Sequence, residues 1–108
     1  MAEEKIYMLN ALWFKPGDGA RKYREYLKAA APFLREAGGR MHSALYAPQS
    51  ALIGEFDADL VFFVEYPSRA AFKQMAQDPG YLAQALPLRE AAIRKSLLIE
   101  CSAKAAGA

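Results

Sequence analysis

Glu65 is the ionisable side chain whose position most suggests chemistry. It lies in the run 60–66, whose other residues are all apolar. A carboxylate inside an apolar strand is unfavourable unless it is paired or faces a solvated cavity, and burial alone raises its pKa. Glu65 is therefore a candidate general base. The alternative is a structural role, in which Glu65 pairs with Arg89 or caps the next helix.

Arg89 and His42 are two further candidates. Arg89 carries a planar cation that suits a substrate carboxylate, but an ion pair with Glu65 or a plain surface position is the simpler explanation. His42 is the only histidine, so it would have to act as an acid, a base or a haem ligand without a second imidazole. The simpler alternative for His42 is a polar residue on an edge strand.

Asn10 and several aromatic residues complete the candidate pocket. Asn10 interrupts the apolar run 6–14 and is either a hydrogen-bond donor to a ligand or a satisfied core amide. The aromatic residues that suit the walls of a pocket, or else pack in the core or a dimer interface, are Tyr7, Trp13, Tyr23, Tyr66 and Tyr81. The candidates that we expect to converge on one cavity above the central strands are Glu65, Arg89, His42 and Asn10, with Tyr66 and Tyr81 beside them.

Several other chemistries are disfavoured. The acidic segment Glu55–Asp59 lacks the 12-residue frame of a calcium loop, so a solvated hairpin is expected there. Cys101 is the only cysteine, which excludes an internal disulfide and a multi-cysteine metal site and favours a buried thiol over a nucleophile. Catalytic-triad, phosphate-loop and dinucleotide motifs are absent from the sequence. We therefore expect neither a metal nor a cofactor.

The bulk composition narrows the class of protein. A length of 108 residues predicts a single domain, with its core at about residues 5–102 and a disordered small-residue tail at 103–108. The net charge is +2 with mixed signs, which disfavours nucleic acid and anionic membranes as partners. The acidic N-terminus and the lack of a run of about 20 apolar residues predict a soluble, cytoplasmic protein.

The elements that must position these residues follow from apolar periodicity and turn signals. Strands are predicted at 6–14, at 41–46 with a second piece at 51–53, at 60–66 and at 95–102. Helices are predicted at 20–37, after the cap Ser68, and again after Asp78-Pro79. Pro32 predicts a kink or a break in the first helix, and Gly38-Gly39 its end. The order β-α-β-β-α-β predicts an α+β fold with a four-stranded antiparallel sheet.

The apolar residues of the strands exceed what one layer of helices can cover. The strands 6–14 and 60–66 are apolar in both alternation sets, and hydrophobic residues make up 54% of the chain. Two main helices cover one face of the sheet only. We therefore expect a homodimer in which a second copy packs its sheet against the uncovered face.

Three short motifs carry a family resemblance over about residues 5–101. They are Glu65-Tyr66-Pro67-Ser68, Asp78-Pro79-Gly80-Tyr81 and Pro87-Leu88-Arg89-Glu90-Ala91. Their order resembles the uncharacterised DUF1330 family of the dimeric α/β-barrel (ferredoxin-like) superfamily. The resemblance implies a barrel-forming dimer and no established activity. The first turn, 15–18, is longer than is usual in that family, which bears on the local loop and not on the fold.

Two classes of function remain. Relatives in the superfamily include cofactor-independent monooxygenases and isomerases, so the first class is a small enzyme of that kind acting on a hydrophobic or aromatic molecule. The second class is a non-catalytic dimer that binds such a molecule or has a structural role, and haem binding is a more distant alternative. An ionisable group deep in the cavity would favour the enzyme, and a purely apolar lining would favour binding.

Overall fold

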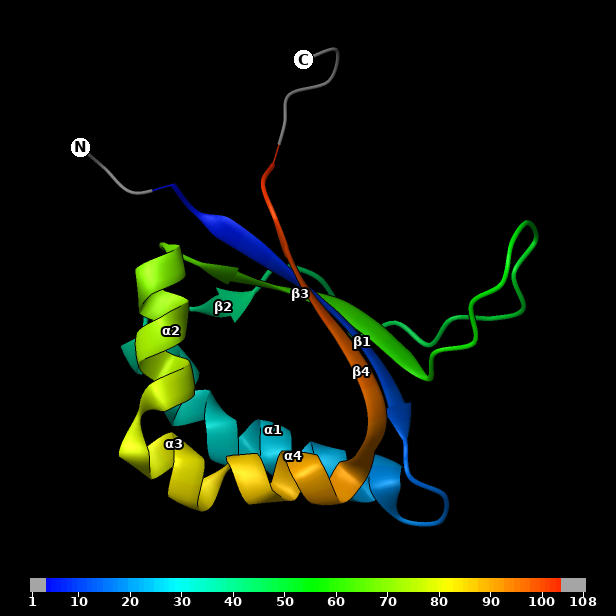
Figure 1. Cartoon of the computed structure of the whole chain (residues 1–108), viewed down its shortest axis with the longest axis horizontal. Coiled ribbons are helices and arrows are strands. Elements are labelled where there is room, and N and C mark those ends of the chain that lie inside the picture. Colours follow the sequence, from blue (N-terminus) through cyan, green and yellow to red (C-terminus); the bar gives the residue numbers. More distant parts are fainter. Residues whose placement is uncertain (1–3, 104–108) are drawn as a thin grey trace.

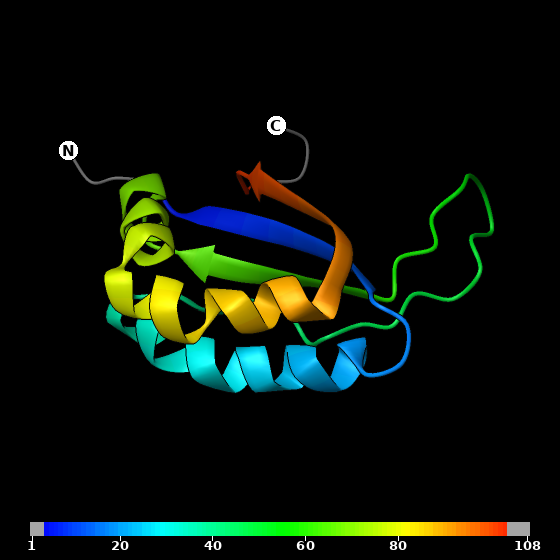
Figure 2. The same ribbon diagram turned by 60° about the horizontal axis from the view of Figure 1, so that its bottom comes forward.

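The computed structural model describes residues 4–103. The antiparallel sheet has the order β2-β3-β1-β4 and consists of β1 (Ile6–Phe14), β2 (Arg40–Met41), β3 (Leu60–Tyr66) and β4 (Ile93–Cys101). The helices are α1 (Gly19–Glu36), α2 (Arg69–Gln77), α3 (Pro79–Gln84) and α4 (Leu86–Ala92). All four helices lie on one side of the sheet (Figure 1 and Figure 2). The predicted α+β fold is confirmed.

The two central strands divide their side chains between two faces, because successive residues of a strand point in opposite directions. On the inner face, which the helices cover, Met8 and Leu12 of β1 pack with Phe62 and Val64 of β3 in the main core. On the outer face, Ala11 and Trp13 form a smaller buried cluster with Ala58. The main core therefore lies between the sheet and the helices.

Helix α1 runs unbroken through Pro32 to Glu36, so the predicted break into two pieces is wrong. Asp18 is the N-cap residue, but its side chain pairs with Arg21 and Lys22 and does not cap a backbone amide. Gly38 ends the helix as predicted, in the left-handed conformation with φ of 76° that glycine adopts without strain.

Two capped turns connect β3 to the later helices. The Ser68 hydroxyl accepts a hydrogen bond from the Ala71 amide at 3.0 Å and begins α2. The Asp78 carboxylate accepts hydrogen bonds from the amides of Gly80 and Tyr81 and begins α3. Both caps are the ones that the sequence predicted, and they fix where α2 and α3 start relative to the end of β3.

The segment between β2 and β3 differs most from the prediction. Only Arg40–Met41 forms a strand, followed by a single bridge between Tyr46 and Val61. Residues 47–59, which we call the arm, project from the body without strand structure (Figure 1). Leu52 is 100% exposed, so the predicted strand piece at 51–53 is wrong.

The sheet of the single chain stays open over residues 4–103, so one chain alone does not close a barrel. None of the helices in this range is long and apolar enough to cross a membrane. Apart from Ala103, the predicted tail 103–108 lies outside the described residues.

Candidate functional site

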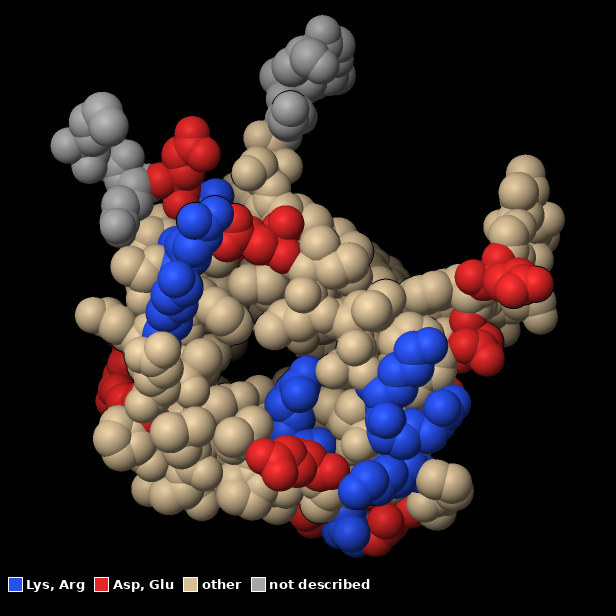
Figure 3. Space-filling view, viewed as in Figure 1, with Lys and Arg blue, Asp and Glu red and all other residues tan. Residues whose placement is uncertain are grey.

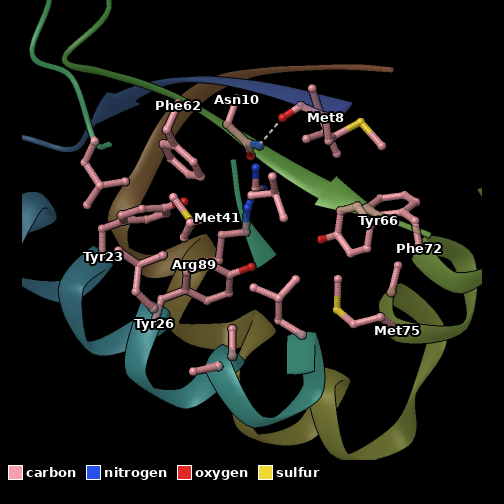
Figure 4. Close-up of a pocket in the computed structure, with 18 of the residues that line it drawn as sticks. Met8, Asn10, Tyr23, Tyr26, Met41, Phe62, Tyr66, Phe72, Met75 and Arg89 are labelled. Atoms are coloured by element: carbon pink, nitrogen blue, oxygen red, sulfur yellow. Dashed lines mark hydrogen bonds between the residues drawn. The ribbon is translucent and has the colours of Figure 1, made fainter. Parts of the chain in front are cut away.

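A cavity of about 520 Å³ lies between the inner face of the sheet and the helices. Figure 3 shows the molecule hollowed at this place, and Figure 4 shows the side chains around the hollow. Its apolar walls are made by Met8, Leu27, Ala30, Leu34, Met41, Phe62, Val64, Phe72, Met75, Leu86 and Leu98, among others. A mainly apolar cavity of this size is typical of a small-molecule site.

Asn10 forms the polar centre of the sheet side of the cavity. In the antiparallel register it lies between Phe62 of β3 and Leu98 of β4, and all three residues line the cavity. The Asn10 side-chain amide donates a hydrogen bond to the carbonyl oxygen of Met8 at 3.1 Å. The Asn10 side chain forms no other hydrogen bond among residues 4–103, so its second amide hydrogen and its side-chain oxygen are available to a ligand.

Arg89 reaches into the cavity from the helix side. It belongs to α4, and Figure 4 shows its side chain extending across the cavity toward Asn10. Among the described residues that line the cavity, it is the only one with a formal charge. Arg89 forms no ion pair or side-chain hydrogen bond within the described part of the chain.

Tyrosine hydroxyls supply the other polar groups. The hydroxyls of Tyr26 on α1 and Tyr81 on α3 are hydrogen-bonded to each other at 2.8 Å. Burial raises the pKa of Tyr23, Tyr26 and Tyr66 well above the usual value of 10, and the positive charge of Arg89 offsets this only in part for Tyr23 and Tyr26. These three phenols therefore stay protonated at neutral pH, where they can donate hydrogen bonds but are poor bases.

Glu65 lies on the opposite face of the sheet. Its side chain is only 9% exposed and accepts a hydrogen bond from the Arg40 guanidinium at 2.9 Å. The Lys5 amine and the His42 ring nitrogen Nδ1 each lie 3.7 Å from a Glu65 oxygen. The predicted pair with Arg89 is therefore wrong, because a neighbouring strand supplies the cation that compensates the carboxylate.

The surroundings of Glu65 also reverse the expected direction of its pKa. Burial acts to raise the pKa, but the hydrogen bond from Arg40, the positive charges of Arg40 and Lys5, and the nearby His42 ring outweigh it and lower the pKa. A raised pKa was expected only for a Glu65 that faces the cavity, and the structure places Glu65 on the other face. A carboxylate held in its ionised form by cations is a weak base.

The structure thus separates the predicted candidates into two groups. Asn10, Arg89, Tyr66 and Tyr81 line the cavity. Glu65 and His42 lie together on the outer face, where the His42 ring packs against Tyr7 with ring centroids 4.6 Å apart. Their predicted convergence on one cavity does not occur.

Two polar residues of these surroundings escaped the sequence analysis. Tyr26 contributes a hydroxyl to the cavity, and Arg40 compensates Glu65. The helical spacing of Tyr23 and Tyr26 on the apolar side of α1 was a signal for the first. For Arg40, the only local signal was its position directly after the glycines that end α1. The pairing of Arg40 with Glu65 of β3 joins residues far apart in the sequence, so no local pattern indicates it.

Comparisons with known proteins agree with this fold. The family described as "Domain of unknown function (DUF1330)" matches residues 11–101. The RPA0582 protein of unknown function from Rhodopseudomonas palustris is 33% identical, with a TM-score of 0.86 over 95% of this chain and 85% of that one. A comparison with curated proteins found no match.

Two more distant structures are similar in fold alone. A dimeric ferredoxin-like protein of unknown function from Jannaschia sp. CCS1 is 14% identical, with a TM-score of 0.73 over 92% of this chain and 99% of that one. A dimeric protein of unknown function with a ferredoxin-like fold from Bacteroides fragilis is 8% identical, with a TM-score of 0.61 over 94% of this chain and 99% of that one. The ferredoxin-like class predicted from the sequence is thereby confirmed.

Proposed function

The chain belongs to the DUF1330 family, as its motifs predicted, and because that family has no known function we propose one from the site itself. The protein binds a small hydrophobic or aromatic molecule in the cavity between its sheet and its helices. We place it in the cytoplasm, because its lone cysteine, Cys101, favours a reducing compartment.

The observation that carries this proposal is the cavity. Its volume of about 520 Å³ lies within the usual range for small-molecule sites. Its lining is mainly apolar, with the amide of Asn10 and the guanidinium of Arg89 as directed polar groups. If this region had only a packing role, its own side chains would be expected to fill the space, because protein interiors are close-packed.

The same lining favours binding over acid–base catalysis. No carboxylate or imidazole lines the cavity among the described residues. The tyrosines that do line it include Tyr23, Tyr26 and Tyr66, whose raised pKa values keep them protonated at neutral pH, so that no phenolate is present to act as a base. We therefore favour the non-catalytic class of function.

We also propose that the protein acts as a homodimer built by sheet-on-sheet packing. The outer face of the sheet has no helical cover, and it carries two apolar rows along the strand register. The rows are Phe63, Leu9 and Ile99, and Val61, Ala11 and Leu97. Similar structures from Jannaschia and Bacteroides are described as dimeric, which supports the same assembly here.

Binding is tested with the neutral fluorescent probe N-phenyl-1-naphthylamine. We expect saturable fluorescence enhancement at about one probe per chain, because each chain has one such cavity between its sheet and its helices. Ala30→Phe places a phenyl ring in the cavity from α1 and should abolish the signal. Ala20→Phe, at an exposed position of the same helix, is the matched control and should bind like the parent.

Two results would contradict the binding function. One is a parent protein that gives no saturable signal with the probe. The other is an Ala30→Phe variant that stays folded by circular dichroism and binds the probe as tightly as the parent does. Both measurements use the full chain.

A further inference from the structure

We propose that the ligand carries a single carboxylate and that Arg89 binds it. This inference rests on the proposed binding function and names the chemical class of the ligand: an aromatic or aliphatic monocarboxylic acid. Its apolar body would occupy the cavity, and its carboxylate would lie between Arg89 on α4 and Asn10 on β1 (Figure 4).

The first observation is the uncompensated charge of Arg89. Arg21, Arg40 and Arg69 each form an ion pair with a described carboxylate, and of the described arginines without one only Arg89 lines the cavity. Arg89 points into an apolar cavity and has no such partner within residues 4–103. A cation in apolar surroundings is unfavourable unless it is paired. A ligand carboxylate would supply the missing partner.

The second observation is the set of hydrogen-bond donors beside Arg89. The Asn10 amide retains one hydrogen without a partner among the described residues. The hydroxyls of Tyr23 and Tyr66 line the same cavity, and burial raises their pKa so that they remain protonated donors. Donors around a cation favour an anionic acceptor over a neutral or cationic ligand.

The third observation is the balance of charge and shape. The described lining holds one positive charge and no negative one, which matches a monoanion and would leave a phosphate dianion undercompensated. A guanidinium presents two parallel N–H groups that fit the two oxygens of a carboxylate. The apolar walls disfavour a second charged group inside the cavity, because that charge would be buried without a partner.

The test compares 4-phenylbutyrate with its neutral analogue 4-phenylbutyramide as competitors of N-phenyl-1-naphthylamine. The two compounds share an apolar body and differ in charge at one end. We expect the acid to displace the probe from the parent at a concentration lower by about tenfold or more, since a hydrogen-bonded ion pair is worth that much or more. Arg89→Met should remove this preference while probe and amide binding stay close to the parent.

Two further variants sharpen the comparison. Arg89→Lys retains the charge but not the planar fork, so it should keep part of the preference for the acid. Arg24→Met removes an exposed arginine of α1 and should leave the preference unchanged.

The outcomes separate this inference from the function on which it rests. A parent that fails to bind the probe contradicts the binding function. A parent that binds the probe but does not distinguish the acid from the amide contradicts the carboxylate alone, and this comparison needs no variant to fold. A folded Arg89→Met protein that keeps the full preference for the acid contradicts the assignment to Arg89.

Discussion

Glu65 and Arg89 show how the two faces of one sheet create different electrostatic environments. Glu65 faces the outer side, where Arg40, Lys5 and His42 surround its carboxylate. Arg89 faces the inner side, where the cavity lining offers it no described counter-charge. The first residue has the properties of a compensated structural carboxylate, and the second is the residue that we propose as the ligand anchor.

The ion pairs of Glu65 make stability depend on pH. Its folded-state pKa lies below the usual value for a glutamate, so its contribution is present at neutral pH and is lost as the pH falls through the folded-state pKa. Glu65→Gln should therefore lower the melting temperature at neutral pH. It should also make the melting temperature depend less on pH between about pH 5 and pH 3. Thermal melts followed by circular dichroism across this range measure both effects.

The control for this experiment is Glu36→Gln, which changes an exposed carboxylate at the end of α1 that has no described ion pair. It should retain the acid dependence of the parent. If the Glu65→Gln protein also follows the parent curve at every pH, the ion pairs on the outer face contribute nothing measurable.

At the residue scale, the sequence predicted which side chains share a face of the sheet better than it predicted which side chains pair with each other. Alternation placed Glu65 on one face with Val61 and Phe63, and the structure agrees. Alternation did not reveal which face the helices cover. Glu65 was therefore expected in the cavity, which in fact lies on the other face of the sheet. The pairing of Arg40 with Glu65 depends on the register of β2 against β3, which no local pattern in the sequence encodes.

Helix starts were predictable because their signals are local. Ser68 and Asp78 each accept hydrogen bonds from amides two or three residues ahead, so the residue type and the following sequence were sufficient. Local signals were not sufficient to predict the course of α1 at Pro32. Of the predicted alternatives, a kink or a break, the break does not occur: α1 continues through Pro32 and packs on α4.

The Ser68 cap gives a prediction at the scale of the element. Ser68 is buried, and its hydroxyl is the acceptor for the Ala71 amide at the start of α2. Ser68→Ala should lower the free energy of unfolding by about 1 kcal/mol. Chemical denaturation of parent and variant measures the difference, with Ser50→Ala in the exposed arm as the control. Coincident unfolding curves for Ser68→Ala and the parent would show that the cap is dispensable.

The arm is the element that local propensity predicted least well. Leu52 and Ile53 are apolar and suit a strand, yet they are 100% and 96% exposed. Strand formation needs a neighbouring strand, and the pairing with β3 stops at the bridge from Tyr46. The base of the arm is fixed by its acidic residues, since Asp57 accepts a hydrogen bond from the Trp13 indole at 2.8 Å.

At the scale of the whole molecule, the one-sided arrangement of the helices leaves an apolar sheet face open (Figure 2). Leu97 and Ile99 of β4 are 40% and 47% exposed on this face, beside the half-buried Leu9 and Phe63. The sequence predicted this excess of apolar surface, because the strands 6–14 and 60–66 are apolar in both alternation sets. It could not show that Glu65 and its cations border the same face, which adds a polar rim to the apolar centre.

The proposed dimer is tested at the centre of that face. The parent should sediment at about 24 kDa at micromolar concentration, twice the 11.9 kDa of one chain. Phe63→Asp should abolish the dimer and lead to unfolded or aggregated protein, because a carboxylate would be buried without a partner in the row formed with Leu9 and Ile99. Leu82→Asp, at an exposed position of α3 away from the sheet, should remain dimeric. A parent that sediments as a stable monomer would contradict the dimer itself. A Phe63→Asp protein that still forms the dimer would place the contact between copies elsewhere than on this face.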